Sequence, residues 1–231
     1  MREKPILFSS EMVRAILDGR KTQTRRIIKP QPCVDLERGY SPCGIIDGKF
    51  VFRTTLGYSN HFEAIYLKPK YQVGDRLWVR ENIKTICYPY RDGKNRYGYG
   101  EQLIEYVADG QTEKCPDAQD EWWRHNWHVR SSTTIPSIHM PRWASRITLE
   151  VTNIRVERLQ DISELDALAE GVDGERLVHG KLNGVEGDFV EGSCREGYKA
   201  LWNSINTKRG YGWEADPWVW VVEFKRIELT I

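Results

Sequence analysis

Apolar residues fall at helical spacing in three short segments of the chain. The first segment begins after Ser9 and Ser10, either of which could cap a helix. Its apolar residues Met12 and Ile16 lie four positions apart, and Gly19 ends the pattern. We therefore expect a short helix that ends at Gly19.

The second helical segment, 161–171, carries acidic residues in its first turn and ends with Glu170 before a glycine. These boundary signals predict that Glu170 is the last helical residue, where its carboxylate opposes the helix dipole. The third segment, 195–206, is predicted to be an amphipathic helix that packs one face on the core. That face consists of Tyr198, Leu201, Trp202 and Ile205.

Strands are predicted where residues alternate between apolar and polar types, or where apolar residues run together. The segment 76–81 alternates after a Gly-Asp turn, as a half-buried strand does. The segment 147–156 alternates with one slip in phase, which suggests a bulge in a long strand. The segment 218–227 is apolar on both sides in its first half, which is typical of a strand buried on both faces. A weak strand is expected at 50–54.

The chain has 231 residues, enough for one large domain or two small ones. We expect a single domain over 1–231 with insertions at about 30–70, 88–135 and 172–194, where periodicity is lost and Pro, Gly or polar residues are frequent. The second insertion includes a Trp-rich segment, 122–128, that could form a lid or a dimer contact.

Composition limits the classes of protein that the chain could belong to. Hydrophobic residues make up 40% and charged residues 29%, which is typical of a packed globular protein and excludes a disordered one. A net charge of +1 means that contact with nucleic acid would need a local basic patch. No signal peptide or membrane span is apparent, and five irregularly spaced cysteines favour reduced thiols. We therefore expect a cytoplasmic protein that has no membrane contact.

The segment from Gly19 to Arg26 combines four basic residues with two threonines and a glutamine. Such a segment can offer donors to an anion or to the edge of a nucleobase. The alternative is a solvated basic loop, because runs of charge usually face solvent.

Gly19, Lys21 and Arg26 resemble the GxKxxxxR signature of the ASCH family, which follows a short helix. Three further stretches resemble this family in their order along the chain: the turn and strand 74–81, the strand 147–156 with the helix 161–171 after it, and the strand 218–227. The segment 136–146 is similar to a longer phage and prophage branch of the family. The resemblance covers roughly half of the chain. It implies a mixed α+β fold, mainly β: a PUA-like (ASCH) β-barrel with flanking short helices and inserted loops.

Where most ASCH proteins have an acid, this chain has Thr24, which makes the site similar to that of the bacterial N4-acetylcytidine amidohydrolases. Alignment by strand and helix puts Glu170 at the third functional position. The resemblance implies that the protein removes an acyl group from N4 of a modified cytosine. Thr24 would be the nucleophile, Lys21 its base and Glu170 the acid/base partner.

This mechanism sets two conditions on Lys21. The pKa of its ammonium must be lowered by burial or by neighbouring cations, for which Arg20, Arg25 and Arg26 have the right charge. Lys21 and Thr24 must also lie on a bend, because residues three apart on a regular strand face opposite sides. Lys21, Thr24 and Glu170 should then converge on a polar cleft, where truncation changes stability by under ~0.5 kcal/mol.

The expected ligand is a modified nucleoside or nucleotide, either free or within RNA or DNA. Aromatic rings beside polar donors bind bases by stacking and edge hydrogen bonds, although each of these side chains taken alone is more often a packing residue. The candidates are Trp78, Glu81, His139, Arg142 and Trp143. Arg25, Arg26 and nearby basic side chains, Arg20 included, would contact phosphates of a polymer.

Two other functions remain open. A non-catalytic reader of RNA or modified DNA could use the same pocket. A nuclease is less favoured, because no acidic metal cluster is apparent. His125, His128 and Cys115 lack a fourth ligand at the usual spacing, so we expect no metal site and no cofactor.

Overall fold

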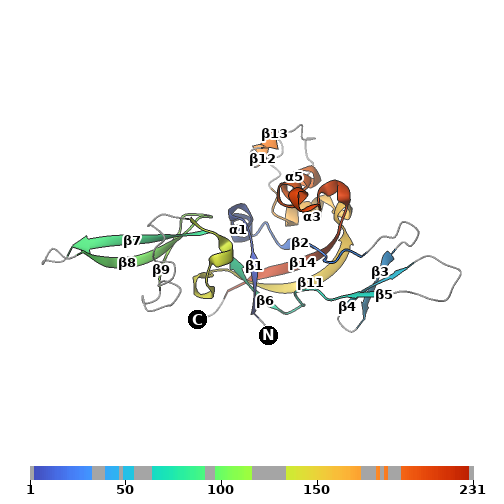
Figure 1. Ribbon diagram of the computed structural model, residues 1–231, viewed down its shortest axis with the longest axis horizontal. Coiled ribbons are helices and arrows are strands. Elements are labelled where there is room, and N and C mark those ends of the chain that lie inside the picture. Colours follow the sequence, from blue (N-terminus) through green and yellow to red (C-terminus); the bar gives the residue numbers. More distant parts are fainter. Residues whose placement is uncertain are drawn as a thin grey trace. The chain divides into compact units, whose positions relative to one another are not determined.

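The computed structural model describes residues 3–32, 40–46, 49–54, 64–91, 97–115, 134–172, 181–182, 185–186 and 194–228. These residues form a mixed α+β structure that consists mainly of strands (Figure 1). The chain divides into two compact units, each made of segments far apart in sequence. The first unit comprises Met1–Gly19, Arg76–Glu150 and Arg226–Ile231, and the second comprises Arg20–Asp75 and Val151–Lys225. The single-domain organisation stays a prediction.

The first unit consists mainly of strands and includes one long β-hairpin. Its elements are β1 (Glu3–Leu7), α1 (Ser10–Leu17), β6 (Arg76–Arg80), β7 (Ile83–Arg91), β8 (Tyr97–Tyr106), β9 (Thr112–Lys114), β10 (Thr134–Ile135), η1 (Ser137–His139), η2 (Arg142–Ala144) and the beginning of β11 (Thr148–Arg158). Strand β6 pairs in parallel with β1 and antiparallel with β11. A second sheet has the order β10-β7-β8-β9.

Helix α1 has the boundaries that its sequence predicts. Ser9 is the N-cap, and its hydroxyl accepts a hydrogen bond from the Met12 backbone N–H at 3.4 Å. Gly19 follows the helix with φ of 75°, in the left-handed region that glycine adopts without strain. The predicted helix that ends at Gly19 is confirmed.

Strand β6 confirms the predicted alternation. Leu77 and Val79 are buried, whereas Arg76, Trp78 and Arg80 are partly exposed. A separate core lies beneath the hairpin strands of this unit. It consists of Ile83, Ile104, Tyr106, Cys115, Ile135, Met140 and Ala144.

The second unit carries two helices on one side of a sheet (Figure 1). Its elements are β2 (Gln23–Ile27), β3 (Tyr40–Ile46), β4 (Lys49–Thr54), β5 (Ala64–Leu67), the continuation of β11, η3 (Leu159–Asp161), α3 (Glu164–Ala169), β12 (Lys181–Leu182), β13 (Val185–Glu186), α5 (Cys194–Asn206), η4 (Thr207–Arg209), η5 (Trp213–Ala215) and β14 (Trp218–Ile227). The sheet order here is β11-β14-β2, and β3-β4-β5 form a separate antiparallel sheet.

Strand β14 is buried on both faces in its first half, as predicted. Val219 and Val221 pack in the core beneath α3 and α5. On the other face, the Trp220 ring contacts the Phe50 ring of β4 edge to face, with 4.8 Å between the centroids. The predicted strand 218–227 is therefore confirmed, and it is the centre of this sheet.

Strand β11 and the two helices agree with prediction in most details. Two consecutive exposed residues, Thr152 and Asn153, separate buried Val151 from Ile154, where the slip in phase was expected. Helix α3 ends one residue earlier than predicted, so that Glu170 is its C-cap. Helix α5 buries Tyr198 and Trp202 but not Ile205, which is 41% exposed.

The expected closed barrel is not present among the residues that the structure describes. Closure would require strands at the two ends of a sheet to pair with each other, and each sheet in these ranges has unpaired end strands. Strands β7 and β8 form a hairpin where no strand was expected. Within the predicted insertion 30–70, the expected strand is present as β4, and β3 and β5 pair with it. Much of the three insertions lies outside the described residues.

No helix among the described residues is long and apolar enough to cross a membrane. Cys115 and Cys194 are buried free thiols.

Two leucines of the second unit test where its core lies. Leu159 is fully buried, whereas Leu165 on α3 is 78% exposed. Leu159→Ala should lower the free energy of unfolding by ~2–5 kcal/mol, because it removes buried apolar contacts and leaves a cavity. Leu165→Ala should change it by less than ~0.5 kcal/mol. Urea unfolding checks both variants, and equal losses would contradict the assignment of this core.

Candidate functional site

The candidate site begins where the chain meets the end of α3. Lys21 forms an isolated antiparallel β-bridge with Glu170, just before β2 begins. The Thr22 backbone N–H donates a hydrogen bond to the Ala169 carbonyl at 2.9 Å. Backbone pairing thus fixes the segment that carries Lys21 against the C-terminus of α3, although the two lie 149 residues apart in sequence.

Lys21 and Glu170 form a buried ion pair. The ammonium Nζ of Lys21 donates to Glu170 Oε2 and to the Glu170 carbonyl oxygen, both at 2.8 Å. Their side chains are 0% and 3% exposed. Because removal of one partner leaves a buried charge, truncation should cost ~3–5 kcal/mol. The smaller cost expected for residues in an open cleft does not apply to this pair.

Arg25 supplies a second cation to the same carboxylate. Its Nη1 lies 3.1 Å from Glu170 Oε1, so each oxygen of Glu170 has its own positive partner. The opposite side of the guanidinium binds Glu157 of β11, through Nε at 2.8 Å and Nη2 at 2.5 Å. Arg25 thereby links three elements, β2, β11 and the end of α3.

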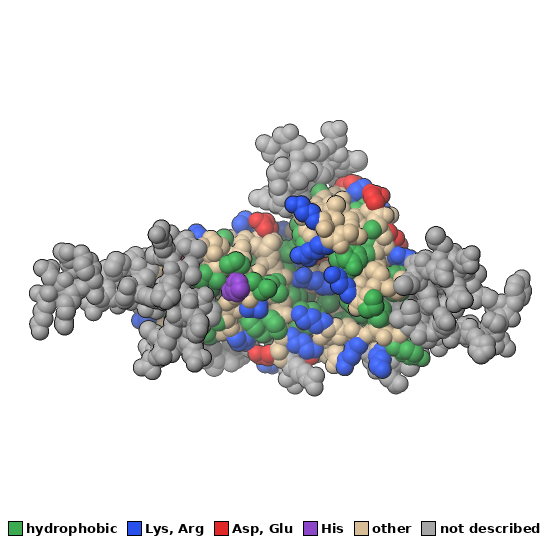
Figure 2. Space-filling view, viewed as in Figure 1, with side chains coloured by type: hydrophobic (Ala, Val, Ile, Leu, Met, Phe, Trp, Pro, Cys, Tyr) green, Lys and Arg blue, Asp and Glu red, His purple; other side chains and the backbone are tan. Residues whose placement is uncertain are grey.

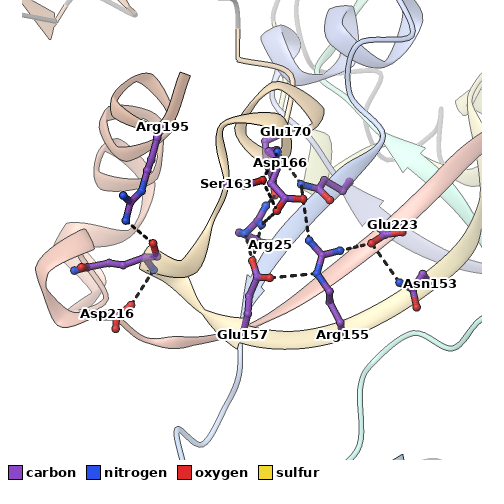
Figure 3. Close-up of polar contacts among 12 residues, drawn as sticks. Arg25, Asn153, Arg155, Glu157, Ser163, Asp166, Glu170, Arg195, Asp216 and Glu223 are labelled. Atoms are coloured by element: carbon purple, nitrogen blue, oxygen red, sulfur yellow. Dashed lines mark hydrogen bonds and ion pairs between the residues drawn. The ribbon is translucent and has the colours of Figure 1, made fainter. Parts of the chain in front are cut away.

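An outer layer of polar side chains surrounds this cluster (Figure 3). Asp166 of α3 accepts a hydrogen bond from Gln23 at 2.9 Å and pairs with Arg155 at 2.9 Å. Arg155 also pairs with Glu157 at 3.2 Å and with Glu223 of β14. Carboxylates and guanidinium groups therefore alternate through the network, and each buried charge has an opposite charge beside it.

Burial and neighbouring charges shift the pKa values of Lys21, Arg25 and Tyr198. Desolvation lowers the pKa of the Lys21 ammonium despite the opposing effect of the Glu170 carboxylate, and Arg26 and Arg25 lower it further. Burial alone would lower the pKa of Arg25, but the charge of Glu170 and the influence of Tyr198 raise it above its ordinary value. Tyr198 is buried beside this cluster, and desolvation raises its pKa.

Thr24 lies on the other face of β2. It is 3% exposed, and side chains alternate along a strand, so it faces away from Gln23 and Arg25. Within the part of the chain that the structure describes, no hydrogen bond joins Thr24 to Lys21 or Glu170. The bend that would bring Thr24 to Lys21 is absent, because Lys21, Gln23 and Arg25 all present their side chains to α3.

The phosphate contact predicted for Arg25 requires correction, whereas those predicted for Arg20 and Arg26 stay predictions. Arg25 is only 4% exposed and its guanidinium binds carboxylates, so it is not available to a phosphate. Arg20 is exposed and donates to the Gly171 carbonyl at 3.3 Å, whereas Arg26 is partly buried. Lys and Arg side chains gather over the region of β2 and α5 on the face in Figure 2. Exposed basic residues that follow these elements are Lys29, Lys208 and Arg209.

The remaining predicted ligand contacts belong to the first unit. The guanidinium of Arg142 lies 5.8 Å from the centre of the Trp78 ring and pairs with Glu3 at 3.0 Å. His139 is exposed, and Trp143 packs against the core of this unit. Their role in binding stays a prediction.

Glu81 belongs to a buried ion pair rather than to an open surface. Both of its oxygens accept hydrogen bonds from Arg146 at 3.0 Å, and it is 1% exposed. Burial raises the pKa of the Glu81 carboxyl although Arg146 opposes that effect. Arg146 also stacks on the Tyr106 ring, with 3.9 Å from Cζ to the centroid. This geometry makes Glu81 a structural anchor for Arg146 within the first unit.

Sequence reasoning missed Glu157, Asp166, Arg155 and Gln23 as members of the site. The available signal was alternation: Arg155 and Glu157 lie two apart on β11, as Gln23 and Arg25 do on β2. Charges at every second position of a strand can share one face. That signal does not reveal which strand faces which helix.

No group of His, Cys, Asp and Glu side chains suited to a metal ion occurs in the described ranges. His125, His128 and the Trp-rich segment lie outside those ranges. Burial raises the pKa of the Cys115 thiol to about 12, so it is a poor metal ligand at neutral pH.

Comparison with known proteins adds no assignment: no family model, curated protein or solved structure matches the chain.

The carboxylate of Asp166 gives the site a testable dependence on pH. Burial alone would raise the pKa of Asp166. Hydrogen bonds from Gln23 and Ser163 outweigh this effect and lower it, and the charges of Arg25 and Arg155 act in the same direction. A lowered folded-state pKa contributes stability above the unfolded value of about 3.9, and that stability is lost as pH falls through the folded value.

Asp166→Asn should therefore destabilise the protein at neutral pH, and its difference from wild type should shrink on acidification below about pH 4. Urea unfolding across an acid pH series measures this difference. The exposed Asp161→Asn variant is the control and should follow wild type throughout. A difference for Asp166→Asn that stays constant with pH would contradict the assigned electrostatics.

Proposed function

We propose that the chain is an ASCH-like protein of PUA-like fold that binds a modified cytosine and hydrolyses an acyl group from its N4 atom. The GxKxxxxR resemblance of Gly19, Lys21 and Arg26 supports the family. The single observation that carries the proposal is the buried contact between Lys21 and Glu170, two of the three positions that the resemblance selects.

The chemistry of amide hydrolysis suits this pair. A water oxygen bonds to the acyl carbon, the bond from that carbon to N4 breaks, and the products are a carboxylic acid and the free exocyclic amine. Glu170 takes a proton from the attacking water, and the two cations beside it hold its carboxylate in place. Lys21 donates a proton to N4 as it leaves, and burial makes its ammonium a stronger acid.

This mechanism assigns the nucleophile to water rather than to Thr24. The hydroxyl of Thr24 lies on the face of β2 away from Glu170, so it cannot be activated by Lys21 in this conformation. Thr24 then contributes to packing beneath β2, where it is buried.

One observation favours the alternative, a non-catalytic reader that binds RNA or modified nucleic acid. Both oxygens of Glu170 already accept from cations, and both side chains of the pair are buried. In a reader, Lys21 and Glu170 would support the recognition surface and transfer no proton. The two functions differ in turnover, which makes them distinguishable.

Incubation of the full chain with N4-acetylcytidine should release acetate and cytidine, measured by chromatography. Lys21→Met and Glu170→Gln should each lower kcat/KM by ~100-fold or more, because each removes a proton-transfer group. Thr24→Val should retain activity within about tenfold, because it removes no transferring group.

Exposed residues of the same types provide controls: Lys68→Met and Glu214→Gln should react as wild type does. Circular dichroism of each variant separates loss of activity from loss of fold. Binding of N4-acetylcytidine without any turnover by wild type would reject the enzyme and support the reader. Loss of activity in Thr24→Val equal to that in Lys21→Met would restore threonine as the nucleophile.

A further inference from the structure

Several groups besides Glu170 hold the Arg25 side chain in place. Glu157 of β11 binds two of its nitrogens through one oxygen, at 2.8 Å and 2.5 Å. Its remaining nitrogen, Nη1, is the one that lies 3.1 Å from Glu170 Oε1. Asp166 lies 3.5 Å from Nη2, and the Tyr198 ring centre lies 5.7 Å from Cζ. The side chain is fully buried, so water does not compete for these contacts.

The consequence falls on the Glu170 carboxylate. One oxygen is held by Arg25 and the other by Lys21, so the plane of the carboxylate is set by two donors that come from the same segment of chain. Without Arg25, this carboxylate would keep the ion pair with Lys21, and a single contact leaves a carboxylate free to rotate. Because Glu170 also pairs with Arg25, its electrostatic attraction for Lys21 is weaker than it would be in an isolated Lys21–Glu170 pair.

We propose that Arg25 is a positioning residue for the pair, which orients Glu170 through the anchor Glu157 and weakens the hold of Glu170 on Lys21. As a contribution to catalysis this inference rests on the proposed function. The orientation of Glu170 by Arg25 and its effect on the pKa of Lys21 do not depend on that function, because both are properties of the protein without substrate.

The charged surroundings of Lys21 agree with this role. Desolvation is the largest influence and lowers the pKa of Lys21, whereas Glu170 at the end of α3 raises it. From β2, Arg26 and Arg25 both lower it. From α5, Tyr198 lies within electrostatic reach of Glu170. Removing the charge of Arg25 should therefore make Lys21 harder to deprotonate.

The test is a titration of Lys21 in the full chain, followed by NMR of lysine labelled at Nζ and Cε and assigned by the signal lost in Lys21→Met. Arg25→Gln should raise the titration midpoint of Lys21 by about one pH unit, because a nearby like charge is removed. Arg155→Gln is the matched control. The Arg155 guanidinium belongs to the same network, but its ion pairs are with Glu157, Asp166 and Glu223 and not with Glu170. Its removal should leave the titration midpoint of Lys21 unchanged.

Arg25→Gln could unfold the protein by leaving Glu157 unpaired. The double variant Arg25→Gln/Glu157→Gln removes both charges and keeps the measurement possible. In either folded variant, an unchanged Lys21 midpoint overturns the proposal, and so does an equal shift in Arg155→Gln. A raised midpoint in a protein that never hydrolyses N4-acetylcytidine would support the positioning role while rejecting the proposed enzyme.

Discussion

The carboxylate of Glu170 is placed where a negative charge is unfavourable on two counts. It lies at the C-terminus of α3, where the helix dipole is also negative, and it is buried away from water. Lys21 and Arg25 offset both effects, and Lys21 also binds the carbonyl oxygen that α3 leaves free at its end. The position of α3 against β2 depends on this compensation.

The contacts of Lys21 and Arg25 with Glu170 also determine which side chains of β2 lie near this carboxylate. Because Gln23 and Arg25 turn toward α3, alternation turns Thr24 toward the opposite side. A threonine nucleophile and a lysine base would need a bend that the backbone pairing of Lys21 with Glu170 prevents. Of the three positions that the resemblance selects, Lys21 and Glu170 therefore lie in contact, whereas Thr24 faces away from them.

Local signals in the sequence predicted the elements with the clearest periodicity. Ser9 and Gly19 marked α1, and the apolar run of β14 predicted burial on both faces. The hairpin β7-β8 was missed, because Pro89 interrupts one strand at a shift in register and glycines occur in the other.

Only part of the site was predictable from the sequence. The resemblance selected Lys21 and Glu170, which lie in contact. Nothing in the spacing of Glu157 or Asp166 indicated that they would surround Arg25, because that depends on how β11 and α3 pack on β2. Arg25 was accordingly expected to face a ligand, whereas its partners are carboxylates of the protein itself.

The claim on which this account depends is that Lys21 and Glu170 interact directly inside the fold. A double-mutant cycle of Lys21→Met and Glu170→Gln, read from urea unfolding, measures that interaction. The account predicts a coupling free energy of about 1.5 kcal/mol or more, because each single variant leaves a buried partner unsatisfied and the double variant does not. Additivity of the two single variants within ~0.5 kcal/mol would show that the pair does not exist in solution and would contradict the account.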